Sequence, residues 1–382
     1  MSAKRIASLA ASRETPFYLY DPSAAASAIR RWKSAAGRRV RVFYPYKCNR
    51  FPPFLDRLAA EGLGAEINIG ADLSGALARG NTGRRLIFQG PAKAPASVDR
   101  VIAVGGMLVA DGEEDARLIV ARARVLGRDP LYMLRLRAPQ AREGQRAFGM
   151  SPEGLVRLAT GAVRRGARPP VGLAFHLGTG IPSLAPYRNA IAMAGEIVRS
   201  LAAGGVSISV IDAGGGFSSP GESRFDDRGR APVSPWTDPP AIVRALEREV
   251  ERRIGAVELW IEPGRALAAE AFSFVTRVVQ VRFDRTVFVD GSRMAHAFFV
   301  ARGVHPLTAI PSRRGKRGTF AIAGPLGTDL DVLVRRTVGV APLVGDLVVF
   351  GAVGAYNLIA ANEWAGPVPP VVEMGKTPRR TR

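Results

Sequence analysis

Eight short apolar runs follow one another along the first two thirds of the chain, and stretches with helical spacing separate them. The runs cover residues 40–46, 65–69, 85–89, 107–110, 131–136, 171–177, 206–211 and 257–261. Each run is short enough for a strand that is buried on both faces, as strands are in a parallel sheet covered by helices. Eight consecutive β-then-α units predict an α/β fold with a (β/α)8 TIM barrel over residues 25–268.

The sequence changes character after residue 268. Strand-like segments at 272–283, 286–289, 297–301, 319–322 and 347–350 are joined by turns, with little helical spacing between them. This pattern predicts a second domain, an antiparallel β-sandwich or barrel-like domain over residues 269–382. The strand-like segment Phe17–Tyr20 precedes the barrel, and we expect residues 1–24 to join the β domain.

The balance of charged residues is strongly basic. Lysine and arginine number 54 and aspartate and glutamate 33, so the formal net charge is +21. Arginines make up nearly all of the excess and are spread along the chain rather than grouped with aromatic residues, so we expect a solvated surface and no nucleic-acid partner. Only six of the basic residues are lysines. Because arginine cannot form an imine, any imine chemistry has few candidate positions.

Cysteine content and hydropathy limit the protein's class further. The chain has one cysteine, so it cannot form an intrachain disulfide or a thiolate metal cluster, and we expect no metal site. No apolar run approaches the 18 residues of a membrane span, and the first residues lack a long apolar segment. We therefore expect a cytoplasmic protein without a membrane partner.

Reactive side chains stand where the predicted strands end, which is where barrels of this kind build their sites. Lys47 directly follows the first run, and His176 stands at the end of the sixth. A lysine at this position either reaches the solvent at the barrel mouth or serves as a nucleophile, because burial lowers the pKa of its amine. A lone histidine at a strand end is more often structural than catalytic.

The last two barrel strands end in residues suited to an anion. The seventh run leads into Gly214, Gly215 and Gly216, and a glycine triplet either forms a plain turn or lets backbone N–H groups approach a phosphate. The eighth run ends before Glu262 and Arg265, which would place a carboxylate and a guanidinium beside that loop. A lysine, a histidine, a glycine loop and a carboxylate thus converge on one barrel mouth.

Taken in this order, the motifs resemble the fold-type III pyridoxal phosphate (PLP) decarboxylases, which include diaminopimelate and ornithine decarboxylases and share an alanine racemase-type barrel. The resemblance covers nearly the whole chain. It takes in residues 15–21, 43–49, 176–179, 212–217, 262–265, 290–291, 324–326 and 354–356.

The resemblance implies roles for individual residues. Lys47 is expected to bind PLP as an imine, His176 to stack on its ring and Glu262 to pair with the ring nitrogen, and these three would be catalytic. The other residues expected to bind the cofactor, mainly its phosphate, are Thr179, Gly214, Gly215, Gly216, Gly264, Arg265 and Tyr356. Members of the family are usually head-to-tail homodimers with shared active sites, and their substrates are small amino acids.

This chain departs from the family at the position of the expected proton donor. A cysteine normally follows the Gly-Pro-Leu segment, and here the residue is Gly327. Loss of a general acid typically costs about 10² to 10⁴ in rate, so either another group protonates Cα or the reaction differs. Cys48 is no substitute, because side chains alternate along a strand and it would point away if Lys47 points in. We expect Cys48 to be a buried packing residue.

The substrate positions also differ. Members that act on basic amino acids carry acidic residues where this chain has Val300 and Thr328, and neither side chain can pair with an ammonium. We therefore expect PLP-dependent decarboxylation of an α-amino acid with a neutral or anionic distal end, in specialised biosynthesis, rather than of ornithine, lysine or diaminopimelate. A PLP-dependent racemase or epimerase and a non-catalytic homologue remain as alternatives, although residues 49–52 favour the decarboxylase branch.

Overall fold

The computed structural model describes residues 2–141, 143–181, 183–219, 223–225, 232–233, 238–295 and 303–375. The chain forms two compact units. One of them, called the barrel unit, consists of Ile29–Ser218 and Pro235–Gly264. The second, the sheet unit, consists of Met1–Ala28, Ser219–Ser234 and Arg265–Arg382.

The barrel unit contains a closed ring of eight parallel strands, in the order β11-β2-β3-β4-β5-β6-β7-β8. Their bounds are β2 Val40–Pro45, β3 Gly64–Ile67, β4 Leu86–Phe88, β5 Met107–Ala110, β6 Leu131–Arg135, β7 Gly172–Ala174, β8 Val210–Asp212 and β11 Glu258–Ile261. Each predicted run overlaps one of these strands, so the predicted fold class is confirmed. The seventh run was predicted too early, because only its last residues and Asp212 join the ring.

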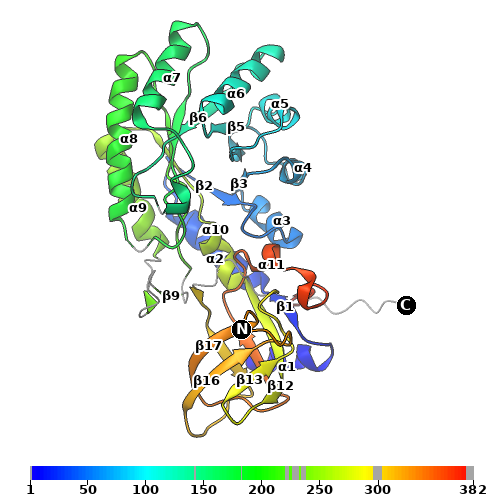
Figure 1. Cartoon of the computed structure of the whole chain (residues 1–382). Helices are drawn as coiled ribbons and strands as arrows, with labels where there is room; N and C mark the ends of the chain where they lie inside the picture. The colour runs from blue at the N-terminus through cyan, green and yellow to red at the C-terminus, as the bar shows by residue number, and fades with distance from the viewer. Residues whose placement is uncertain are drawn as a thin grey trace. The chain divides into compact units, whose positions relative to one another are not determined.

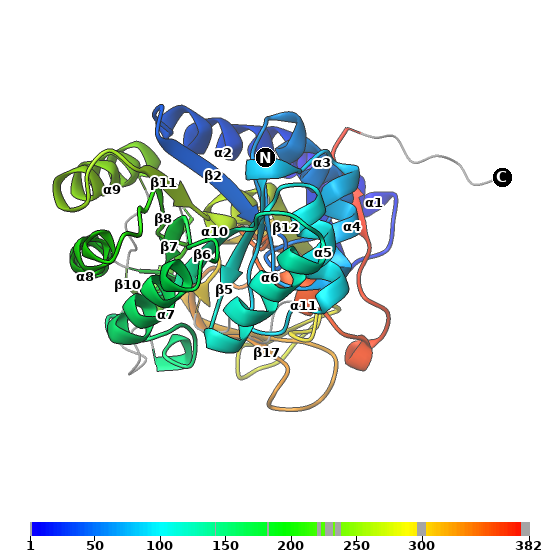
Figure 2. The same ribbon diagram turned by 90° about the horizontal axis from the view of Figure 1, so that it is seen from above.

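Helices lie outside the ring, as Figure 2 shows for the view from above. They are α3 Pro52–Ala60, α4 Gly70–Ala78, α5 Pro95–Ala103, α6 Glu113–Val125, α7 Pro152–Arg164, α8 Ala185–Ala203 and α9 Pro239–Arg253, and short 3-10 turns occur at Gly83–Arg85 and Glu143–Gln145. Two local signals start α7: Pro152 in its first turn needs no hydrogen-bond partner for its nitrogen, and the Ser151 hydroxyl accepts a hydrogen bond from the Gly154 N–H at 3.2 Å. Helix α2, Pro22–Ala35, contains the boundary between the units.

Large apolar side chains fill the inside of the ring. Phe43 and Trp260 come from neighbouring strands, and their ring centroids lie 4.7 Å apart. The other members of this buried cluster are Ile87, Met107, Val109, Met133, Ala174 and Val210. Because the interior is a packed core rather than a channel, the strand ends are the places where polar side chains can gather.

The sheet unit contains an eight-stranded sheet in the order β15-β18-β12-β13-β16-β17, with β1 pairing both β12 and β19 (Figure 1). The bounds are β1 Phe17–Tyr20, β12 Phe272–Val281, β13 Thr286–Val289, β15 Leu307–Ile310, β16 Gly318–Ala323, β17 Val332–Gly339, β18 Leu347–Phe350 and β19 Val371–Glu373. Most pairs are antiparallel, but β13 with β16 and β1 with β19 are parallel. A smaller sheet joins β9 Ser223–Phe225, β10 Pro232–Val233 and β14 Gly303–Val304.

Short helices complete the elements: α1 Ala3–Ala11, α10 Gly264–Ala268, α11 Asn357–Ala360 and 3-10 turns at Ala269–Ala271 and Glu363–Ala365. The sequence prediction identified β13 and β18 with their observed bounds and missed α1, β15, β17 and β19. The predicted strand 297–301 lies outside the described residues. In the part of the chain that the structure describes, no helix has the length and hydropathy that crossing a bilayer requires.

Candidate active site

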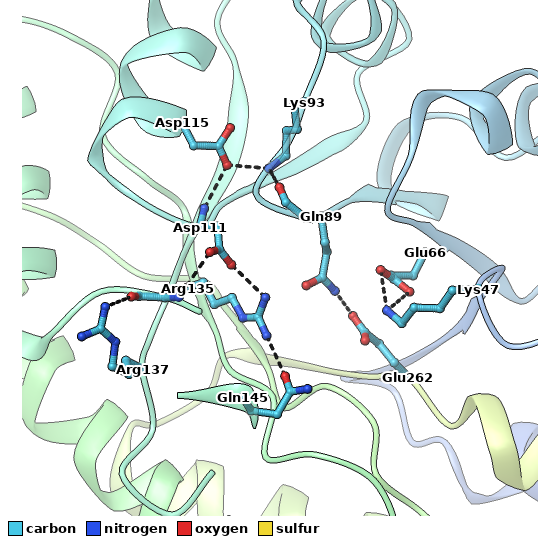
Figure 3. Close-up of polar contacts among 12 residues, drawn as sticks. Lys47, Glu66, Gln89, Lys93, Asp111, Asp115, Arg135, Arg137, Gln145 and Glu262 are labelled. Carbon is cyan, nitrogen blue, oxygen red and sulfur yellow. Dashed lines mark hydrogen bonds and ion pairs between the residues drawn. The ribbon is translucent and has the colours of Figure 1, made fainter. Parts of the chain in front are cut away.

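Lys47 and Glu66 form an ion pair at the mouth of the barrel, defined here as the carboxyl ends of its strands (Figure 3). Lys47 follows β2, and Glu66 lies on β3, the next strand in the ring. The Lys47 Nζ lies 2.9 Å from Oε2 and 3.1 Å from Oε1 of Glu66. The Glu66 side chain is 0% exposed, whereas that of Lys47 is 40% exposed. The amine is therefore fixed on one side by a buried carboxylate and borders open space on the other.

Neighbouring charges decide the ionisation of Lys47. Burial lowers the pKa of its amine, but the carboxyl groups of Glu66 and Glu262 outweigh this effect and raise the pKa above its ordinary value. Lys47 is thus an ammonium ion at neutral pH in the cofactor-free chain, and it must give up a proton before it can act as a nucleophile.

Glu262 follows β11 and is buried beside two other carboxyl groups. The Gln89 amide donates a hydrogen bond to its Oε1, and the backbone N–H of Gln89 is itself held by the Ile67 carbonyl at 2.9 Å. Burial, followed by the charges of Asp212 and Glu66, raises the pKa of Glu262 well above its ordinary value. Burial also raises the pKa of Asp212 to about 7. This group of carboxyls therefore holds a proton near neutral pH.

His176 is a neutral imidazole at the same mouth, in the loop after β7. The Gly215 N–H donates to its Nδ1 at 3.2 Å, so Nδ1 is an acceptor and the proton resides on Nε2. Burial, with smaller effects of Lys47 and Arg135, lowers the pKa of His176 to about 3. The ring is consequently uncharged at any pH near neutrality.

The glycine loop after β8 has no room for side chains. A Cβ at Gly215 would lie 2.4 Å from the Glu262 carbonyl oxygen, and one at Gly214 would lie 2.6 Å from that of Phe175. Gly214 and Gly216 have φ of +65° and +100°, in the left-handed region that favours glycine. The loop's backbone thus lies directly against the ends of β7 and β11.

Side chains fix the glycine loop in place. Asp212 Oδ1 accepts a hydrogen bond from the Gly214 N–H at 2.8 Å, and the Tyr187 hydroxyl donates to the Gly215 carbonyl at 2.7 Å. The Ile181 N–H donates to the Gly216 carbonyl at 2.9 Å, which aligns the loop that contains Thr179 with the glycine loop. The sequence-predicted residues Lys47, His176, Gly214–Gly216 and Glu262 are therefore brought together at one mouth.

A second charged network occupies the adjoining strand ends (Figure 3). Arg135, at the end of β6, donates to Asp111 at 2.8 Å and to Gln145 at 3.3 Å. Lys93 forms a buried ion pair with Asp115, which also accepts from the Asp111 backbone at 2.9 Å. These residues were missed by the sequence analysis, as were Glu66 and Gln89. Gln89, Asp111 and Arg135 share one signal, a polar side chain at or just after the end of a predicted barrel strand.

The comparisons with known proteins agree with this geometry. Residues 24–269 match the family model described as pyridoxal-dependent decarboxylase, pyridoxal binding domain. The chain is 31% identical over 348 residues to a diaminopimelate decarboxylase of Deinococcus radiodurans, covering 90% of this chain and 85% of that protein. It is 30% identical over 372 residues to a chloroplastic ornithine decarboxylase of Nicotiana glutinosa, covering 92% and 82%. The chain belongs to the pyridoxal-dependent decarboxylase family.

Solved structures share the fold. Diaminopimelate decarboxylase from Helicobacter pylori, complexed with L-lysine, has a TM-score of 0.83 at 22% identity and covers 96% of this chain and 93% of its own. The arginine decarboxylase of Paramecium bursaria Chlorella virus, bound to agmatine, has a TM-score of 0.82 at 18% identity and covers 98% and 100%.

As a member of this family the chain is a PLP-dependent amino-acid decarboxylase, and its described residues fit the cofactor. The Lys47 side chain is 40% exposed, which leaves it accessible for covalent attachment. The buried Glu262 carboxyl, with its raised pKa, suits a shared proton with a pyridine nitrogen. The backbone of the glycine loop is bare of side chains where a phosphate would approach.

Of the remaining predicted cofactor residues, Thr179 and Gly264 belong to the barrel unit, and Arg265 and Tyr356 belong to the sheet unit. Gly264 packs against β2, since a Cβ there would lie 2.5 Å from the Pro45 ring. In the sheet unit, the Arg265 guanidinium stacks over the Tyr356 ring at 5.2 Å. The predicted roles of Thr179, Gly264, Arg265 and Tyr356 in cofactor binding stay predictions. Cys48 is fully buried, as expected for a packing residue.

The predicted substrate residues lie in the sheet unit. Gly327 has a φ of +64°, and no atom lies within 4 Å of where its Cβ would be. The Thr328 hydroxyl bonds to the exposed Asp329 at 3.3 Å. Val300 lies outside the described residues.

We predict that His176 stays neutral across the physiological pH range. In the cofactor-free chain, the NMR signal of its Cε1–H should not move between pH 8 and pH 5, because the pKa of its imidazole is about 3. The unfolded chain binds this proton below a pH of about 6.5, so this residue's effect on stability becomes less favourable as pH falls from there toward 3. The chain has three histidines, and His176→Gln assigns the signal. A titration midpoint between pH 6 and 7 would contradict the prediction.

We predict that Gly215→Ala weakens PLP binding by at least about tenfold, or about 1.4 kcal/mol, because the added methyl group forces the loop away from the Glu262 carbonyl. Absorbance titration of the cofactor-free chain measures this. Gly75→Ala in α4 is the matched control, since the nearest atom to its Cβ is the flexible Arg79 side chain at 3.4 Å. Equal PLP affinity of a folded Gly215→Ala variant and the unaltered chain would refute the steric argument.

Proposed function

We propose that this enzyme decarboxylates an α-amino acid whose distal end is neutral or anionic. The observation that carries the proposal is the sequence at Val300 and Thr328, the two positions where the resemblance to decarboxylases of basic amino acids would call for acidic residues and where this chain has none. An ammonium buried there would find no carboxylate at either residue, and an unpaired buried charge is strongly unfavourable. A carboxylate or an apolar end meets no such penalty.

Two acidic residues follow Thr328, and the buried one, Asp331, is already occupied by other hydrogen-bond donors. Asp331 is 1% exposed, and its oxygens accept hydrogen bonds from the Ser292 hydroxyl at 2.9 Å, the Arg293 N–H at 2.7 Å and the Leu326 N–H at 3.0 Å. Asp331 therefore ties two loops together. Asp329 is exposed and accepts from the Thr328 hydroxyl.

In the proposed reaction each residue of the barrel mouth has a separate task. When bound, PLP supplies an electron-withdrawing ring that accepts the electron pair released as CO2 departs. Lys47 would hold the cofactor covalently and, after the reaction, would displace the product amine from it. The neutral His176 ring would stack on the cofactor without adding charge, and Glu262 would share a proton with the ring nitrogen. That proton would stabilise the transition state electrostatically, and the effect would be strong because Glu262 is buried.

The remaining predictions of the sequence analysis form part of this proposal. Backbone N–H groups of the glycine loop, with Thr179, Gly264, Arg265 and Tyr356, would bind the phosphate. The resemblance to fold-type III decarboxylases supports a homodimer in which each subunit contributes Gly327 and Thr328 to its partner's site. We further propose that the enzyme works in the cytoplasm.

The relatives' names point to a different substrate class, amino acids with a basic distal group. Those proteins are named for diaminopimelate, ornithine and arginine, which all carry a distal ammonium or guanidinium. A chain that kept their preference would need a carboxylate for that group, and Asp329 is the exposed candidate.

We predict that CO2 release from the PLP-loaded enzyme is fastest with an amino acid that lacks a distal cation. The panel contains L-glutamate, L-2-aminoadipate, L-norleucine and L-methionine, against L-ornithine, L-lysine, L-arginine and meso-diaminopimelate. The best member of the first group should exceed the best of the second by roughly tenfold or more, as expected for an unpaired buried charge. Faster release from ornithine or lysine would overturn the proposed substrate class.

Thr328→Asp sharpens the same test. The added carboxylate should raise CO2 release from L-ornithine relative to the unaltered enzyme, whereas the isosteric control Thr328→Val should not. If Thr328→Asp leaves the ratio of ornithine to aminoadipate turnover unchanged, position 328 does not face the substrate's distal end.

A further inference from the structure

Position 327 lacks the thiol of the related decarboxylases, so the proton that takes the place of CO2 must come from another group. Three barrel-mouth groups are poorly suited. His176 is neutral, with its Nδ1 already accepting from the glycine loop. Glu262 is committed to the ring nitrogen, and Asp212 is 1% exposed and turned toward the Gly214 N–H.

Lys47 differs from these groups in combining a dissociable proton with access to the reaction space. Its side chain is 40% exposed at the barrel mouth, and its amine carries three protons of which Glu66 can engage two. The ammonium therefore has an N–H left to direct at a neighbouring carbon.

We propose that Lys47, held in place by Glu66, delivers the proton that replaces CO2 on the substrate's Cα. The inference rests on the proposed function, because it assigns the donor for that decarboxylation. It also explains how a chain with Gly327 can complete the reaction.

The step balances without another reactant. The bond between Cα and the carboxylate breaks, and CO2 leaves without the bonding electron pair. One N–H bond of the Lys47 ammonium breaks, and its proton joins that electron pair to form the new Cα–H bond. Lys47 is left as a neutral amine, which is the form that can displace the product amine and restore the starting enzyme.

Glu66 acts through Lys47 and is a positioning residue. Both of its oxygens contact Nζ, which fixes the direction of the amine, and its negative charge keeps the amine protonated until Cα requires the proton. No other ion pair to Glu66 occurs within the described ranges. Because the carboxylate is fully buried, loss of its partner's charge is unfavourable, which favours the return of a proton to Lys47.

The first arm of the test follows the fate of the product carbon in the PLP-loaded enzyme. Glu66→Gln keeps the shape of the side chain and removes its charge. CO2, primary amine and carbonyl product are counted together for each amino acid of the panel. The unaltered enzyme should give one amine for each CO2. In Glu66→Gln, Cα protonation should fail in a measurable share of turnovers. In those turnovers water releases the product as an aldehyde, and the substrate's amino group stays on the cofactor. Glu66→Asp should restore most of the amine product.

The second arm uses the cofactor-free chain and needs no substrate. Trinitrobenzenesulfonate reacts with neutral amines, and peptide mass spectrometry reports labelling of each lysine against pH. Lys47 should react roughly tenfold faster at pH 8 in Glu66→Gln than in the unaltered chain, because the Glu66 carboxylate that holds the pKa of the amine up is gone. Lys33, whose ion-pair partner is the partly exposed Glu61, is the internal control, and its labelling rate should not change. Asp99→Asn, which breaks the two-oxygen pair with Arg122, controls for loss of an ion pair elsewhere.

The outcomes separate the inference from the proposed function. An aldehyde from Glu66→Gln, with faster labelling of Lys47, supports the inference. One amine for each CO2 in Glu66→Gln overturns it and leaves the decarboxylase intact, as does unchanged labelling of Lys47. If Glu66→Gln does not fold, the same counts on Glu66→Asp decide, with a partial shift toward aldehyde expected. If the unaltered enzyme releases CO2 from no amino acid of the panel, the proposed function fails and the inference fails with it.

Discussion

The pairing of β11 with β2 closes the barrel, and the active site depends on that closure. Trp260 on β11 is in parallel register with Arg41 on β2, so the carboxyl ends of the two strands lie on the same side of the ring. Lys47 and Glu262, which are far apart in the sequence, therefore follow adjacent strand ends. Without this parallel register, the amine and the carboxyl could not influence each other's pKa.

The barrel mouth then places more negative than positive groups in a poorly solvated space. Glu66, Asp212 and Glu262 are all at most 4% exposed, and Lys47 is the cation nearest to them. Electrostatic interactions between such groups are much stronger than in water. The result is an amine that keeps its proton, carboxyls that hold a proton near neutral pH, and a histidine that takes none. Each protonation state suits the task proposed for that residue.

The sequence allowed the architecture and the reactive residues to be predicted, because both depend on local pattern. Short apolar runs identified the barrel strands, and Lys47, His176 and Glu262 stood at their ends. The residues that control these groups were missed. Glu66 lies inside a strand and Gln89 just after one, and only the direction of each side chain reveals that it faces the site. That direction follows from the pleat and the register, which a single sequence does not specify.

The second unit was harder to predict for a related reason. In strand β17 the exposed Arg335 and Arg336 follow only three consecutive apolar residues. Its place in the sheet therefore depends on pairing with β16 rather than on composition. Likewise, the parallel pairs β13 with β16 and β1 with β19 join segments that are distant in the chain. Such contacts are determined by the whole sheet.

The central claim, that the Lys47 amine is the attachment point for PLP, has a direct test. The chain is loaded with PLP, reduced with borohydride, digested and analysed by mass spectrometry. Lys93 provides the internal comparison, because it is also buried at the mouth and burial lowers its pKa, but its side chain is 0% exposed and paired with Asp115. We expect the phosphopyridoxyl group on the peptide containing Lys47 alone. A label on Lys93, or on neither lysine, would contradict the account.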